Sequence, residues 1–430
     1  GSGVSYAEAT ARHLLILELD LLIAELDASG RPASGAIVDR LMQVVDLPST
    51  EGAASRPIRT GVDGTMAAQQ TFGELGEAVS VLDAMPDRAA SFRESSGRAM
   101  PVVGYKDDSL SPTDVLLDLF AEIENLVLTR GEGTPGPGGE AIERVYVSAS
   151  GIDYRQLVSS YLTTAVAYSQ AADALLDDDV AGEGLLSSPV EPEAFARATR
   201  LENAWDQAFG YFGAARDYDA YTDDEIAAAG GRDAWQGSHD SDGDSRIDFT
   251  AEYNFGDARL AAERDRSSAS AIDLTRDAFG ALLLGRTMVA SATQGLSLEE
   301  LDTLRGYRDR VLAAWEKTIA ASAIHAINDV LEDVASFDNE RYDFEAHARH
   351  WSALKGLVLG LQFNPRHAIV RPEQRLGLDA AVGAAPVLAD ADRATRAAQQ
   401  EELRAARATL FEIYGFDPVD LGDDNGAGGW

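Results

Sequence analysis

Acidic residues recur at alternate positions in one short stretch of this sequence, HDSDGDSRIDFTAE, which spans residues 239–252. Asp240, Asp242 and Asp244 are each two residues apart, and Asp248 and Glu252 follow them. Carboxylates crowded into one folded loop repel each other unless a cation neutralises them. Ca²⁺ is a hard cation that prefers several oxygen ligands. The stretch therefore predicts a calcium-binding loop.

The spacing matches a calcium loop of the EF-hand type. If Asp240 takes its first position, Asp242 and Asp244 take the third and fifth. The backbone carbonyl of Arg246 and the side chain of Asp248 then take the seventh and ninth. We expect the ion to be structural and to fix the shape of the long loop between helices at residues 216–256.

Two departures make the loop a variant of that motif. Ser245 stands where the motif prefers glycine for a sharp turn, and Glu252 falls one position later than the usual bidentate glutamate. No second loop of this kind is visible in the sequence. The alternative is a solvated acidic loop in an acidic protein. We expect Ca²⁺, with the metal ligands Asp240, Asp242, Asp244, Arg246, Asp248 and Glu252.

Four further residues are candidates for a second metal or polar site in the core of a helical bundle. Glu202 and Asp206 are spaced i, i+4, so their carboxylates share one helix face. His325 lies within an apolar helical run, and His350 lies on another. Together these four residues are candidates to hold a transition metal, iron or zinc. The alternative is that an arginine pairs with the acids and that His325 is a satisfied core histidine.

Signals of catalysis are poor. The sequence contains no G-x-S-x-G, no H-E-x-x-H and no G-x-x-x-x-G-K-[ST] motif. It has only three lysines and no cysteine, so lysine chemistry and thiol chemistry are not favoured. We expect a protein that is not an enzyme.

Helical periodicity dominates the elements that must position these residues. Apolar residues recur at i, i+3 and i+4, and Ser111-Pro112 and Ser297-Leu-Glu-Glu300 supply start signals. Gly280 and Gly285 lie in one helical run, which indicates close helix packing. The predicted helices span 6–26, 112–128, 154–176, 192–212, 271–284, 297–334, 343–361 and 390–414.

We therefore predict an all-α protein of packed helical bundles with long irregular loops. Residues 4–130 form an N-terminal helical segment, and 141–415 form the main bundle region with the calcium loop at 240–252. The two are expected to make one compact two-bundle unit. Residues 422–430 are expected to be a disordered tail.

Composition limits the classes of partner. The 430 residues are 45% hydrophobic, which allows a sizeable core, and their net charge is −36. That charge repels nucleic acid and attracts cations. No apolar run is long enough to cross a membrane. The first residues, Gly1-Ser2-Gly3, look like a cloning remnant, so any export signal would precede them.

Several stretches resemble one bacterial family, domain of unknown function 4856. They include ENAWDQAFGYFG at 202–213, IDFTAEYNFG at 247–256, AWEKTIAASAIHAIN at 314–328 and HWSALKGLVLGLQFNP at 350–365. The family is similar to the imelysin-like group, so the resemblance implies a pair of packed helical bundles. It also implies a late glutamate at the position of Glu252. The H-x-x-E motif of imelysin-like proteins is incomplete here, because Ala353 follows His350 where glutamate is expected.

The resemblance also implies a setting. It predicts an exported, calcium-binding protein of the periplasm or an outer-membrane lipoprotein, which serves metal (iron) acquisition as a binding protein. Its partners would be a metal ion and an outer-membrane receptor or other envelope protein. One alternative is a metal-dependent imelysin-type peptidase or hydrolase. Another is a structural or interaction protein that binds a protein or a glycan.

Overall fold

The structure is a computed structural model. It describes residues 4–28, 33–49, 51–60, 62, 66–76, 79–86, 101–106, 108–130, 135–137, 141–192, 198–227 and 238–430. The described residues form helices, turns and loops, with isolated β-bridges and no strand. The predicted all-α class of packed helical bundles is therefore confirmed. The division into two bundles stays a prediction.

Twelve α-helices lie in the described part of the chain. They are α1 (Ala7–Ala24), α2 (Ala36–Val45), α3 (Pro112–Thr129), α4 (Tyr154–Leu162), α5 (Arg200–Phe212), α6 (Asp223–Ala227), α7 (Gly256–Ser267), α8 (Leu274–Ser291), α9 (Leu298–Ser336), α10 (Phe344–Gly360), α11 (Pro372–Val382) and α12 (Arg393–Tyr414).

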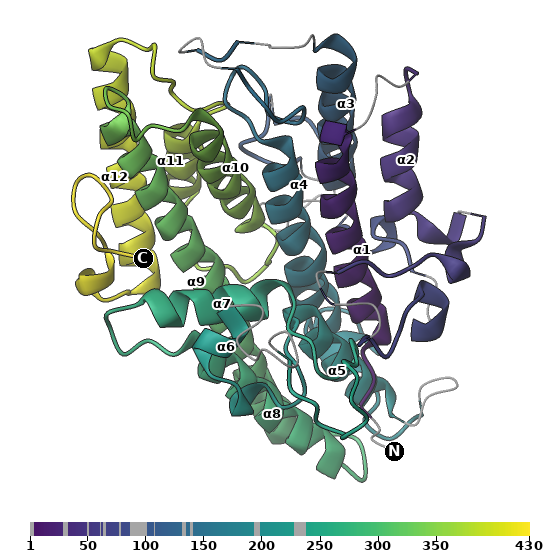
Figure 1. Cartoon of the computed structure of the whole chain (residues 1–430). Coiled ribbons are helices and arrows are strands. Elements are labelled where there is room, and N and C mark those ends of the chain that lie inside the picture. Colours follow the sequence, from purple (N-terminus) through teal and green to yellow (C-terminus); the bar gives the residue numbers. More distant parts are fainter. Residues whose placement is uncertain are drawn as a thin grey trace.

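The helices form two groups that meet along α4 and α10 (Figure 1). In the first group α1 contacts α2 and α4, and α3 contacts α2 and α4. In the second, α9 contacts α10 and α12, and α11 contacts α12. Helices α5, α7 and α8 join the two groups at one end, where α5 contacts α1 and α8, and α7 contacts α9. The long helix α9 therefore runs past most of the second group.

Small residues allow α4 and α10 to lie close together. A Cβ atom built on Gly356 would lie 2.5 Å from the Cβ of Ser160, and one built on Gly360 would lie 2.4 Å from the Oγ1 of Thr164. The two glycines are four residues apart, so they share one face of α10. Beyond Leu162, α4 continues as wider π-helical turns over Thr163–Tyr168 and Ala171–Leu175.

Helix starts follow the signals in the sequence. Ser111 caps α3 by accepting a hydrogen bond from the backbone N–H of Asp114, and Pro112 occupies the first turn. Ser297 and Glu300 form a capping box at the start of α9, as predicted. The predicted helix at 154–176 is interrupted by the π-helical turns. The predicted helix at 192–212 begins only at Arg200, and residues 193–197 of it lie outside the described residues.

The C-terminal tail differs from its prediction. Residues 422–430 were expected to be disordered because they are polar and rich in glycine. Instead, Trp430 is only 4% exposed and its ring lies 4.7 Å from that of Phe416. Its indole N–H donates to the carbonyl of Arg264, and the side chain of Asn328 donates to its carbonyl. One large apolar side chain with two polar anchors holds a segment whose own composition favours disorder.

Candidate calcium loop and interhelical cleft

Three carboxylates of the predicted calcium loop converge. Oxygen atoms of Asp240, Asp242 and Asp244 all lie within 4.8 Å of one another, and the last two side chains are exposed. Within the described residues, no other group of three or more acidic or histidine side chains meets this distance. The three acids that alternate in the sequence are therefore the part of the predicted ligand set that the structure brings together.

The backbone of the loop has the turns that the motif requires. Ser245 adopts a left-handed conformation with φ +66°, at the position where glycine is usual. Ile247 follows, fully buried, and its backbone pairs with a segment from the first helical group. Its N–H donates to the carbonyl of Met66 and its carbonyl accepts from the N–H of Ala68. This pairing anchors the exposed acids to the core.

The carboxylates of Glu252 and Asp248 stabilise the loop by accepting hydrogen bonds. Glu252 is 1% exposed; one of its oxygens accepts from the N–H and Oγ of Ser241, and the other accepts from the N–H of Asp248. One oxygen of Asp248 accepts from Thr250 and from Gln69. The structure therefore places these two predicted ligands in the hydrogen bonding of the loop and not in the three-carboxylate cluster. A buried carboxylate needs such donors whether or not a metal is near.

A neighbouring acidic group lies against the same loop. The His239 ring stacks on Tyr221 with centroids 3.6 Å apart, and its Nδ1 lies 3.1 Å from a carboxylate oxygen of Asp217. Asp219 is exposed. These contacts fix the start of the loop. Asp219 takes part in neither contact and does not belong to the three-carboxylate cluster.

The predicted second metal site is not assembled. The guanidinium of Arg286, on α8, bridges Glu202 at 2.8 Å and Asp206 at 2.6 Å. Burial raises the pKa of Asp206 to about 6, although the arginine opposes the shift. The prediction that these acids join His325 and His350 is therefore wrong. Two carboxylates at i, i+4 suit a forked guanidinium as well as they suit a metal.

Glu202 also has a role that its sequence neighbours indicate. With Thr199 it forms a capping box at the start of α5, because each side chain accepts from the other residue's backbone N–H. Thr199-Arg-Leu-Glu202 is the T-x-x-E pattern of that motif. The sequence therefore contained a sufficient structural explanation for Glu202.

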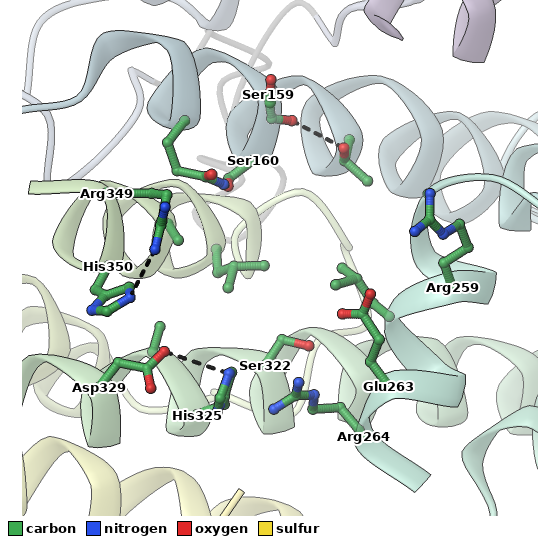
Figure 2. A pocket seen from close by; sticks show the side chains of 17 residues that line it. Ser159, Ser160, Arg259, Glu263, Arg264, Ser322, His325, Asp329, Arg349 and His350 are labelled. Atoms are coloured by element: carbon green, nitrogen blue, oxygen red, sulfur yellow. Dashed lines mark hydrogen bonds and ion pairs between the residues drawn. The ribbon is translucent and has the colours of Figure 1, made fainter. Parts of the chain in front are cut away.

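His325 and His350 lie instead at a cleft of about 370 Å³ between α4, α7, α9 and α10. Figure 2 shows the two histidines on neighbouring helices, with Asp329 beside His325 and Arg349 beside His350. The Nδ1 of His350 lies 2.8 Å from a carboxylate oxygen of Asp333. Burial lowers the pKa of His350, but the Asp333 carboxylate outweighs it and the net shift is upward. Ala353, which replaces the glutamate of the H-x-x-E motif, also lines the cleft.

Several buried polar atoms of the cleft have no hydrogen-bond partner among the described residues. They belong to Arg259 (Nε), Arg264 (Nε and Nη1), Ser322 (Oγ) and His325 (Nδ1). Arg264 is 6% exposed and Ser322 is 4% exposed. Sequence reasoning identified His325 and His350 here but missed both arginines and the serine. The two arginines lie on α7 and the serine lies on α9, and no local motif connects them.

Comparison with known proteins gives one family. The model of the family described as Domain of unknown function (DUF4856) matches residues 121–229, which extend from α3 to the segment before the calcium loop. The family resemblance drawn from the sequence is confirmed over this part of the chain. No curated protein and no solved structure matches the sequence. Among the residues that the structure describes, no helix has the length and apolar character needed to cross a bilayer.

Proposed function

We propose that this chain is a calcium-binding helical protein whose loop at 240–252 folds around one Ca²⁺ ion. The observation that carries the proposal is the convergence of Asp240, Asp242 and Asp244 to within 4.8 Å. Like charges at this separation near solvent repel each other by about 1 kcal/mol per pair, and a bound cation would turn this repulsion into attraction. Carboxylate oxygens are the ligands that Ca²⁺ prefers.

The position of the loop gives the ion a structural role. Ile247 ties the loop to residues 66–68, and Glu252 ties its two ends together. Helix α7 begins four residues after Glu252. An ion held by the three aspartates, with the carbonyl of Arg246 as a further ligand, would therefore stabilise the connection between the first helical group and α7.

Calorimetry tests the proposal. Addition of Ca²⁺ to protein stripped with EDTA should release or absorb heat and should raise the melting temperature. At a free Ca²⁺ concentration of about 100 times Kd, the gain in the free energy of unfolding is about 2.7 kcal/mol.

Two matched variants locate the ion. Asp242→Asn removes one charge from the cluster and keeps the oxygen that accepts from the N–H of Asp244, so it should abolish the calcium effect. Asp219→Asn removes the same charge from an exposed position outside the cluster and should keep the effect. A protein whose melting temperature ignores Ca²⁺, or an Asp242→Asn variant that responds as the parent does, would contradict the proposal.

The wider role rests on the family resemblance. We propose that the protein works at the cell envelope as a binding protein in metal acquisition, with an envelope receptor as partner. The net charge of −36 supports attraction of cations to its surface. The incomplete H-x-x-E motif, with Ala353 in place of glutamate, favours a binding protein over a metal-dependent hydrolase.

A further inference from the structure

The cleft between α4, α7, α9 and α10 is locally basic in a strongly acidic molecule. Three arginines line it, Arg259, Arg264 and Arg349, together with two acids, Glu263 and Asp329. His350 adds further capacity for positive charge, because the Asp333 carboxylate raises its pKa, whereas burial and Arg264 lower the pKa of His325. The whole chain has twice as many acidic as basic residues, 72 against 36. A surplus of guanidinium groups at one cavity therefore points to a ligand of negative charge.

Arg264 is the central observation. Its side chain is buried, yet its Nε and Nη1 have no acceptor among the described residues, with none of which it forms an ion pair. Leaving a buried charged donor unpaired costs several kcal/mol, so such donors are rare in folded proteins. Attraction by Glu263 and Asp329 offsets only part of the cost of burial, since the net effect is that the pKa of Arg264 is lowered. Asp329 itself lies 3.4 Å from His325.

Other unpaired groups lie on the same cavity. Figure 2 shows Ser322 and His325 on α9 beside Arg264, with Arg259 across the opening on α7. The Oγ of Ser322 and the Nε of Arg259 are buried without a partner. A hydroxyl can donate, and a guanidinium offers several N–H groups in one plane. This combination suits the oxygens of a carboxylate or a phosphate, which bind arginine in a bidentate manner.

We propose that this cleft binds a small organic or inorganic oxyanion, held by the Arg264 guanidinium and the Ser322 hydroxyl, with Arg259 as a second cationic contact. A free metal ion is the opposite case, because three guanidinium groups repel it. The site shares no residue with the calcium loop, so the two proposals stand or fall separately.

Titration calorimetry on the full chain tests the proposal with three simple probes in separate experiments, succinate, inorganic phosphate and sulfate. Each titration uses EDTA-stripped protein, so that calcium salts do not form, and the succinate titration is repeated with calcium-loaded protein. Binding of succinate alone would identify carboxylate ligands. Binding of phosphate or sulfate would identify tetrahedral oxyanions. Failure of all three probes at millimolar concentration would overturn the proposal.

Two variants separate a role in binding from a structural role, because a binding residue should lose anion affinity on substitution without a loss of stability. Ser322→Ala removes a buried hydroxyl that has no partner, and Arg264→Met removes a buried unpaired charge and keeps an apolar stem. Each should weaken anion binding by about tenfold or more, because charged hydrogen bonds are lost. Each should leave the melting temperature of the ligand-free protein equal to or above that of the parent.

Arg276→Gln is the matched control for charge, because Arg276 is 82% exposed on α8 and lies outside the cleft. It should leave anion affinity unchanged. Circular dichroism checks that each variant is folded. If Arg264→Met does not fold, the anion affinity of Ser322→Ala alone tests the proposal. Unchanged affinity in Ser322→Ala and in a folded Arg264→Met would overturn the proposal, as would an equal loss in Arg276→Gln.

Discussion

Ser245 holds a backbone conformation that its own side chain disfavours. Its φ of +66° lies in the left-handed region, where a residue with a Cβ atom is strained by about 1 kcal/mol relative to glycine. The conformation occurs at the turn of the acidic loop, between Asp244 and Arg246. The strain is tolerated because hydrogen bonds on both sides of the turn fix the chain.

Ser245→Gly should therefore stabilise the loop. The free energy of unfolding should rise by up to about 1 kcal/mol, and calcium affinity should rise if the loop is better formed before the ion binds. Urea denaturation and calcium titration measure the two effects. Gly243→Ala is the opposite control, since Gly243 also has a positive φ, of +77°, and should lose stability. A destabilised Ser245→Gly variant would show that the serine side chain makes a necessary contact.

Glu252→Gln should lower the free energy of unfolding both with and without calcium. Glu252→Gln keeps one acceptor oxygen, but it replaces the other, so one of the N–H groups of Ser241 and Asp248 loses its acceptor. We expect a loss of about 1–3 kcal/mol in EDTA, because a buried donor is left unpaired. Thermal unfolding in EDTA and in Ca²⁺ measures it. A loss seen only in Ca²⁺ would show instead that Glu252 is primarily a metal ligand.

Single residues also show where reasoning from sequence reaches its limit. The alternation of Asp240, Asp242 and Asp244 was sufficient to predict their convergence, because the spacing is local. The partner of Glu202 and Asp206 was not predictable, since Arg286 is about eighty positions away and only the packing of α5 on α8 brings it near. Local spacing determines local geometry, whereas ion-pair partners depend on tertiary contacts.

At the scale of elements, the packing of α5 against α8 depends on one missing side chain. A Cβ atom on Gly285 would overlap the ring of Trp205, 1.9 Å from its Cζ2. The indole N–H of Trp205 donates to the carbonyl of Leu282 one turn away, so the ring cannot move freely. The prediction of close helix packing is therefore confirmed at Gly285. It is wrong at Gly280, where nothing lies within 4 Å of such a Cβ.

These two glycines provide a matched pair on one helix. Gly285→Ala should lower the free energy of unfolding by about 1–3 kcal/mol, because the added methyl group overpacks a filled site. Gly280→Ala should raise it by up to about 1 kcal/mol, because alanine is the better helix former and has room. Urea denaturation of both variants tests this. Equal effects of the two substitutions would mean that Trp205 can move aside.

The predicted helices were accurate where a long apolar period coincided with a cap. Helices α3 and α9 begin within one residue of their predicted starts, at Ser111-Pro112 and Ser297. The helices α2, α6, α7 and α11 were not predicted, because each is short, at 5 to 12 residues. Moreover, α2, α7 and α11 have no side-chain N-cap hydrogen bond. A short helix without a cap signal depends on tertiary packing for its stability.

At the scale of the whole molecule, one buried acid should make stability depend on pH. Asp257 is fully buried on α7, and the indole N–H of Trp315 donates to it at 2.6 Å. Burial raises its pKa from 3.8 to about 7. Between these values the folded protein keeps a proton that the unfolded chain has lost. This contribution to stability is complete below pH 3.8 and is lost as the pH rises to about 7 and above, by up to about 4 kcal/mol.

Asp257→Asn should remove that loss. At pH 8 the variant should exceed the parent in its free energy of unfolding, and at pH 4 the two should be similar. Urea denaturation across this range, in calcium-free buffer, gives the comparison. Asp277→Asn is the control, because Asp277 also lies in the first turn of a helix but is exposed. Parallel pH profiles for the parent and Asp257→Asn would contradict the assignment.

The fold class followed from the sequence, but the cleft did not. Helical periodicity is repeated along the chain, so many residues contribute to one conclusion. The cleft depends on where four helices meet, and its unpaired atoms on Arg264 and Ser322 are recognisable only when the surroundings of each atom are known. The ordered position of Trp430 has the same cause, since its contacts lie on α7, α9 and α12.

Helix α9 joins distant parts of the molecule without interruption. Its 39 residues extend about 58 Å, and its side chains meet Asp178 through Arg308, Tyr168 through Glu316 and the last residue through Asn328. Ser322 lies between these contacts. Because the backbone of α9 is continuous between these contacts, we expect a small movement at the cleft to displace the contacts on both sides of Ser322 as well. Deuterium uptake by backbone amides near Asp178 would then report events at Ser322.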